Sequence, residues 1–204
     1  SPNFKSKPVI HNLARVGALR RKISILNPIN YFQISDFIVK NWSYLEGYFD
    51  KAKFSKSKPY IGSNRPIEPE YNLSEISIKR AEVRALSKYL LQTDVSQCYH
   101  SFYTHSIPWA IHGKEQSKND KSDNLLGNIL DILVRNSQDQ QTNGIPIGPD
   151  CSLLISEIIL SAVDKKLIEP TIVRNGFRYM DDYEVCFDSR SDAECFLSNL
   201  QESL

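Results

Sequence analysis

The chain has 204 residues, of which 41% are hydrophobic and 24% are charged. This length suits one sizeable domain or two small lobes with a real core, which excludes a disordered or fibrous protein. No run approaches the roughly 18 apolar residues of a membrane span, and the first residues carry no apolar signal segment. The four cysteines lie at unrelated spacings, so we expect no disulfide framework or zinc cage, and a reducing, cytoplasmic setting.

The net charge of +1 conceals two halves of opposite sign. Residues 1–90 hold 16 Lys and Arg against 7 Asp and Glu, a net charge of +9. Residues 91–204 hold 9 against 17, a net charge of −8. A basic half suits contact with phosphates, and an acidic half concentrates carboxylates for another purpose. Ordinary solvated surface is the alternative explanation of the same bias.

Apolar spacing indicates the elements of the first half in chain order. Residues 10–26 combine leucines and valine at helical spacing with several basic residues, which predicts a short basic helix. Residues 35–49 predict an amphipathic helix with Ser35 as its N-cap. The proline-containing stretch 55–70 predicts a loop. Residues 71–91 are ambiguous, and we interpret them as extended structure leading into an apolar run.

The second half shows clearer patterns. Residues 125–133 and 154–162 have the apolar spacing of buried helices. The aromatic and β-branched runs 177–180 and 183–187 are separated only by Asp181-Asp182, which predicts a β-hairpin with two acids at its tip.

A capping box marks the last predicted element. Ser191 and Glu194 open a helix whose apolar face is still running at Leu204. We therefore expect these residues to be a piece of a longer protein, with a partner surface for this helix outside them.

Asp181-Asp182 is the most informative dipeptide in the sequence. Its adjacent carboxylates repel each other, so their presence at one hairpin tip requires a reason. Asp is a common turn residue, so an ordinary turn is the alternative explanation of Asp181 and Asp182. Asp94 follows the apolar run 89–91 and is placed to end a strand beside the hairpin, which would bring in a third carboxylate. Such a group suits Mg²⁺, which takes oxygen ligands from one or two carboxylates plus substrate phosphates. Two such ions about 3.5–4 Å apart serve nucleotidyl transfer.

Three segments resemble the motifs of reverse transcriptases. Residues 179–182 (Tyr-Met-Asp-Asp) resemble the Y-x-D-D motif, and residues 93–99 (Thr-Asp-Val-Ser-Gln-Cys-Tyr) resemble the D-x-x-x-x-[FY] motif. Residues 144–149 (Gly-Ile-Pro-Ile-Gly-Pro) resemble the intervening P-Q-G segment, with Ile147 where Gln is usual. The segments stand in the order of the family and cover roughly residues 79–187, over half the chain.

The resemblance implies an α+β fold with the fingers and palm of a right-hand polymerase, the palm being an antiparallel sheet packed on helices. The implied fingers are residues 1–88 and 105–143, and the implied palm is residues 89–104 and 144–204. The thumb is expected outside this stretch, so we expect residues 1–204 alone to be inactive or weakly active.

Catalytic roles follow from the resemblance position by position. Asp94, Asp181 and Asp182 are the implied catalytic acids. Together with the backbone carbonyl of Val95 they are the implied ligands of two Mg²⁺ ions, with Mn²⁺ as an alternative. Tyr99 is implied to pack against the 2′ position of the incoming sugar and to select dNTPs by a clash with the 2′-hydroxyl. A core aromatic at a transition from strand to helix is the alternative.

Nucleotide contacts are implied for three further residues. Arg80 and Arg84 are the implied triphosphate ligands, since a guanidinium fork matches phosphate oxygens. A solvated basic face is the alternative. Gly148 lies in a loop whose glycines allow close approach of the backbone to a nucleotide, and a plain helix-entry turn is the alternative there.

Residues 103–110 (Tyr-Thr-His-Ser-Ile-Pro-Trp-Ala) and the 144–149 loop are similar to bacterial reverse transcriptases of the abortive-infection and defence-associated groups. Members of these groups protect the host from phage, some make DNA without a template, and several form oligomers. The resemblance therefore implies an RNA-directed or template-independent DNA polymerase that uses dNTPs and an RNA or DNA template-primer, is able to form homo-oligomers and needs no membrane.

Two alternatives remain. The first is a catalytically idle polymerase-like module for nucleic-acid binding or oligomerisation, which has no use for three clustered acids that repel phosphate. The second is an RNA-dependent RNA polymerase, which Tyr99 disfavours because that enzyme must accept a 2′-hydroxyl.

Overall fold

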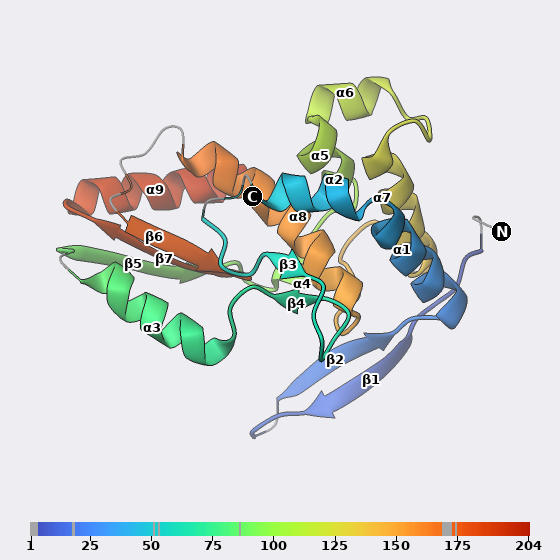
Figure 1. The fold of residues 1–204 in the computed structure, drawn as a ribbon, viewed down its shortest axis with the longest axis horizontal. Coiled ribbons are helices and arrows are strands. Elements are labelled where there is room, and N and C mark those ends of the chain that lie inside the picture. Colours follow the sequence, from blue (N-terminus) through green and yellow to red (C-terminus); the bar gives the residue numbers. More distant parts are fainter. Residues whose placement is uncertain are drawn as a thin grey trace. The chain divides into compact units, whose positions relative to one another are not determined.

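The computed structural model describes residues 4–17, 19–50, 52, 54–85, 87–168, 173 and 175–204. The fold is mixed α+β, with small antiparallel sheets and several helices, which agrees with the predicted class (Figure 1). Contacts divide the chain into unit 1, Ser1–Leu45 and Gln97–Ile155, and unit 2, Glu46–Ser96 and Ser156–Leu204. The assignment of fingers and palm stays a prediction.

A two-stranded hairpin opens unit 1. Strand β1 (Val9–Ala14) pairs antiparallel with β2 (Arg20–Ile25). The predicted helix over 10–26 is therefore wrong. Its apolar spacing depended in part on Val16, which lies in the turn and is 96% exposed. Gly17 in the same turn has φ 74°, a conformation that suits glycine.

Helices make up most of the rest of unit 1. They are α1 (Pro28–Lys40), α4 (Cys98–Ser101), α5 (Ser106–His112), α6 (Lys114–Asn119), α7 (Leu126–Asn136) and the first turns of α8 (Asp150–Ile168). Helix α7 packs against α1 and α5. The helices predicted over 125–133 and 154–162 are confirmed by α7 and α8.

The helix predicted over 35–49 is two helices. Helix α1 begins at Pro28, after the Asn27 side chain accepts the N–H of Ile29, so Ser35 is not its N-cap. It ends at its C-cap, Asn41, and α2 (Trp42–Phe49) follows at once. Asn27 and Pro28 form a helix start that apolar spacing alone does not reveal.

Unit 2 is built on a three-stranded antiparallel sheet in the order β5-β7-β6. Its strands are β5 (Tyr89–Asp94), β6 (Asn175–Tyr179) and β7 (Asp182–Phe187). The predicted hairpin and the predicted strand that ends at Asp94 are both confirmed. Within the predicted loop 55–70, β3 (Pro59–Tyr60) and β4 (Glu68–Pro69) form a short ladder.

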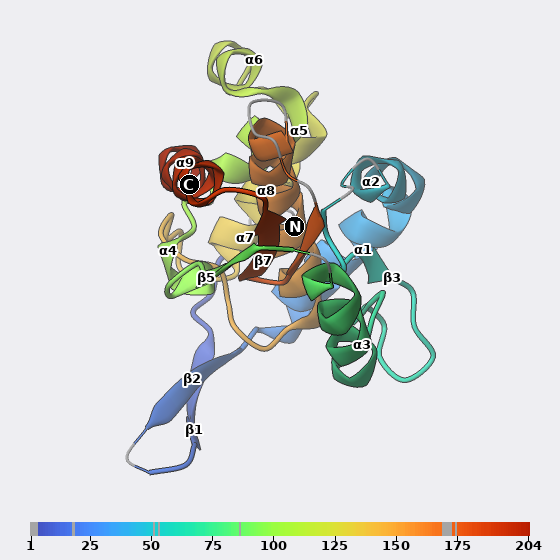
Figure 2. The same cartoon turned by 90° about the vertical axis from the view of Figure 1, so that its left-hand side faces the viewer.

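Helices cover both faces of this sheet (Figure 2). Helix α3 (Leu73–Arg84) packs on β6 and β7, and α9 (Arg190–Ser203) packs on β5 and β7. Extended structure over 73–84 is therefore a wrong prediction. Asn72 and Glu75 form a capping box at the start of α3, and this helix signal outweighs the alternation of isoleucines that suggested a strand.

The start of α9 also differs from its prediction. The N-cap is Ser189, whose side chain accepts the N–H of Asp192, and the predicted capping box at Ser191 and Glu194 is not the cap. Both serines precede the same apolar face, so the sequence pattern does not separate them. The helix itself is confirmed, with Phe196 and Leu200 buried.

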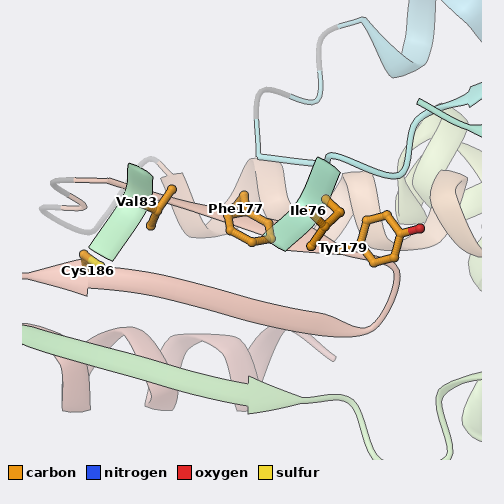
Figure 3. Close-up of a cluster of buried hydrophobic side chains, with 5 residues drawn as sticks. All are labelled: Ile76, Val83, Phe177, Tyr179 and Cys186. Carbon is orange, nitrogen blue, oxygen red and sulfur yellow. The ribbon is translucent and has the colours of Figure 1, made fainter. Parts of the chain in front are cut away.

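A buried cluster fixes α3 to the sheet (Figure 3). Ile76 and Val83 of α3 point toward the sheet and pack with Phe177 and Tyr179 of β6 and Cys186 of β7. Seven residues make about two helical turns, so Ile76 and Val83 point the same way. Burial of these side chains is the main stabilisation of this face.

No helix in the described part of the chain is long and apolar enough to cross a membrane. All four cysteines are free thiols, and three of them are buried.

We expect Phe177→Ala to lower the free energy of unfolding by about 3–5 kcal/mol, because it removes a ring that is 1% exposed and leaves a cavity. Phe32→Ala is the matched control, since that ring is 69% exposed, and we expect a change within about 0.5 kcal/mol. Urea denaturation measures both. Similar losses for the two variants would contradict the packing of α3 on the sheet.

Candidate active site

Three acids from two distant segments meet at one end of the unit 2 sheet. Asp94 is the last residue of β5 and lies directly opposite Asp182, the first residue of β7. Opposite residues in antiparallel strands have Cβ atoms about 4.5–5.5 Å apart. Asp181 lies in the turn before β7, and its carbonyl accepts the N–H of Val95 at 3.1 Å. The predicted convergence of these acids is therefore present.

The acids share a sheet face with α3. Side chains alternate between faces along a strand, so Asp182, Glu184 and Cys186 point to the same side. Cys186 belongs to the cluster under α3, and Glu184 binds two arginines of α3, which identifies this side. Asp94 pairs with Asp182 and points the same way. The rim of this face is open, because Asp94 and Asp182 are both exposed residues.

The acids interact electrostatically. Partial burial and the neighbouring carboxylates of Asp181 and Asp94 raise the pKa of Asp182 above its ordinary value. The Arg80 guanidinium opposes this shift, and the Glu184 carboxylate adds to it. Neighbouring carboxylates repel one another, and a bound cation removes that repulsion.

The donor set fits a hard divalent ion. The available donors are carboxylate oxygens of Asp94, Asp181 and Asp182 and the backbone carbonyl of Val95, and Mg²⁺ prefers oxygen ligands. Within the described ranges, no three His, Cys, Asp or Glu side chains already converge tightly enough to enclose an ion. Mg²⁺ usually takes only one or two carboxylates and completes its shell with waters and phosphates, so an open arrangement suits it.

The predicted triphosphate ligands are both bound to a buried carboxylate. Arg80 donates from Nε to Glu184, and Arg84 donates from Nη2 to the same carboxylate at 2.8 Å. The Glu184 side chain is 1% exposed, whereas those of Arg80 and Arg84 are 35% and 43% exposed. The structure thus gives both arginines a structural role beside the acids, and their contact with a phosphate stays a prediction.

The other two predicted nucleotide-binding residues belong to unit 1. Tyr99 lies in α4, half-buried, with its ring 6.3 Å from that of Phe102. Gly148 precedes α8 with φ 124°, and a Cβ there would lie 2.6 Å from the Ile23 side chain. The glycine is therefore required by close packing on β2, where Ser24 N–H donates to the Ile147 carbonyl at 2.7 Å.

The segment 103–110 also folds within unit 1. The ring of Tyr103 lies 4.8 Å from that of His105 and 5.7 Å from that of Trp109. His105 Nδ1 lies 2.7 Å from a buried carboxylate oxygen of Asp131 on α7. This pairing joins residues that are 26 positions apart, so local sequence patterns do not reveal it.

Several charged residues of unit 2 were missed from sequence. Glu184 stands two residues after Asp182, and strand alternation places both on one face. Glu157 and Asp164 stand seven residues apart in the apolar run of α8, where two acids on one helix face signal a buried cation. That cation is Arg178 of β6, which contacts both carboxylates at 2.7 Å.

Comparison of the sequence with protein-family models and with curated proteins gave no match. The function must therefore be inferred from the motifs and from the geometry of the three acids.

We expect loss of both arginines to cost far more stability than loss of either. Arg80→Ala with Arg84→Ala leaves Glu184 buried and unpaired, for a loss of about 3 kcal/mol in the free energy of unfolding at neutral pH. Each single variant keeps one partner for Glu184, and since both arginines are partly exposed we expect less than about 1 kcal/mol from each.

Adding Glu184→Gln to the double variant should restore part of the loss, because it removes the unpaired charge. Urea denaturation of the wild type and the four variants measures this, and additive losses without rescue would contradict it.

Proposed function

We propose that this chain is the fingers and palm portion of a reverse-transcriptase-type DNA polymerase that acts in defence against phage. Its substrates are dNTPs, and it extends an RNA or DNA template-primer or acts without a template. What supports the proposal most is the placement of Asp94 opposite Asp182, with Asp181 beside them in the turn.

The acids define a cation-dependent reaction. Asp94, Asp181, Asp182 and the Val95 carbonyl would hold Mg²⁺, with Mn²⁺ as an alternative. Such ions, when bound, lower the pKa of the attacking hydroxyl and neutralise charge on the phosphates. The residues themselves contribute positioning, since phosphoryl transfer depends mainly on alignment and on charge neutralisation.

The other predicted site residues have separate proposed tasks. Tyr99 would exclude a 2′-hydroxyl by steric clash. Arg80 and Arg84 would attract the triphosphate while they remain bound to Glu184, because one carboxylate neutralises only one of two guanidinium charges. Gly148 would let the loop backbone approach a nucleotide in addition to its packing role.

Incubation of the full-length protein with labelled dNTPs and Mg²⁺, with and without an RNA template, tests the proposal. We expect incorporation by the wild type and a loss of about a hundredfold or more in Asp181→Asn, since one charge-stabilising group is removed. EDTA should abolish the signal. Asp50→Asn, an exposed acid of unit 2, is the matched control and should behave as the wild type.

Binding of template-primer without any incorporation would instead support the idle nucleic-acid-binding module. Incorporation that Asp181→Asn leaves intact would overturn the assignment of the site. The defence role is tested separately by phage plaquing on cells that express the wild type or Asp181→Asn, where only the wild type should reduce plaque numbers.

A further inference from the structure

The turn that carries Asp181 has an unusual backbone. Met180, its first residue, has φ 55°, in the left-handed region that residues other than glycine rarely adopt. Its N–H donates to Ser57 Oγ at 2.8 Å, and its carbonyl accepts from Arg178 Nη1 at 2.8 Å. Side chains from outside the turn therefore bind both polar backbone groups of Met180.

Arg178 is fully buried, and each of its five N–H donors has an acceptor. Nε donates to Asp164, Nη2 donates to Asp164 and Glu157, and Nη1 donates to Glu157 and the Met180 carbonyl, all at 2.7–3.1 Å. Two carboxylates thus fix the guanidinium so that one N–H points at the turn. Lysine, with three donors and no planar fork, cannot reproduce this set.

Ser57 connects the turn to the same carboxylate. Its Oγ accepts the Met180 N–H and donates to Glu157 Oε2 at 3.1 Å. A parallel bridge between Ser55 and Arg178 brings this segment beside β6. Ser57 and Arg178 therefore approach Met180 from two segments, and both are held by Glu157.

The two carboxyls of the network are unequal. Burial raises the pKa of Glu157, but the charge and hydrogen bonds of Arg178 outweigh it and leave that pKa below its ordinary value. Burial holds the pKa of Asp164 above its ordinary value. Glu157 therefore ionises more readily, and it is the carboxylate that binds Ser57.

We propose that Ser57 and Arg178 are positioning residues that set the conformation of the Met180–Asp181 turn and thereby aim the carboxylates of Asp181 and Asp182. A left-handed methionine persists only where its surroundings impose that conformation, and these two contacts impose it. The inference rests on the proposed function, since it concerns the same acids, but the shape of the turn can be measured without activity.

The test compares Ser57→Ala with Ser161→Ala. Ser161 is a matched control, because it is a buried serine of α8 whose Oγ donates to Glu157 Oε1 at 3.2 Å and whose bond does not involve the turn. We expect hydrogen exchange in a peptide spanning residues 178–184 to become about tenfold faster in Ser57→Ala, through loss of the hydrogen bond to Met180. Exchange in Ser161→Ala should stay near that of the wild type.

Kinetics of dNTP incorporation by the full-length protein give the second readout. Misplaced carboxylates should lower kcat in Ser57→Ala by about a hundredfold while the KM for dNTP changes less than about twofold. Ser161→Ala should keep both constants. Arg178→Lys retains the charge, and when folded it should show the same faster exchange as Ser57→Ala. If Arg178→Lys does not fold, the comparison of Ser57→Ala with Ser161→Ala alone decides the positioning role.

The outcomes separate the two proposals. An inactive wild-type protein would defeat the proposed function, and the exchange experiment would still decide whether Ser57 holds the turn. Equal exchange and equal kcat in Ser57→Ala and Ser161→Ala would overturn the positioning role while leaving the polymerase proposal intact.

Discussion

The register between β5 and β7 decides which side chains meet on each face of the unit 2 sheet. Because Asp94 lies opposite Asp182, the acids and Glu184 fall on the α3 side, and Tyr183 and Val185 fall on the opposite side. A slip of one residue would move the acids of β7 to the opposite face and bring Tyr183 and Val185 to the α3 side. Tyr183 and Val185 are 0% exposed in their present packing, so such a slip would be very unfavourable.

The hairpin of β6 and β7 carries two charge clusters, each built around one buried charged side chain, and the two central charges have opposite signs. On the α3 side, one carboxylate, Glu184, is held by two arginines. On the α8 side, one guanidinium, Arg178, is held by two carboxylates. Buried charges cost desolvation energy, and they stabilise a fold only where partners and hydrogen bonds compensate them. Their value here is geometric, since each cluster fixes a helix to the strands that carry the acids.

Local sequence was sufficient to predict an element where burial of one face imposes a regular spacing of apolar residues. The runs on either side of Asp181-Asp182 predicted the hairpin correctly, and the buried helices followed from their apolar spacing. The β1–β2 hairpin was missed because most of its side chains are exposed, so its apolar spacing reports no buried face. The network around Arg178 could not be derived either, since Ser57 and Glu157 meet it only through tertiary contacts between segments about 20 to 120 residues apart. The placement of Asp94 beside the hairpin was predictable only because two signals pointed to the same position. One was the motif that contains Asp94, and the other was the apolar run that predicted a strand ending there.

Gly148 has a consequence for how two segments of unit 1 pack together. The absence of a side chain lets the loop lie directly against Ile23, and the hydrogen bond from Ser24 to Ile147 joins the two backbones. Strand β2 therefore contacts the loop that leads into α8 through backbone atoms as well as the Ile23 side chain. Any larger residue at position 148 would force these two segments of unit 1 apart, so the packing of the β1–β2 hairpin depends on a position outside it.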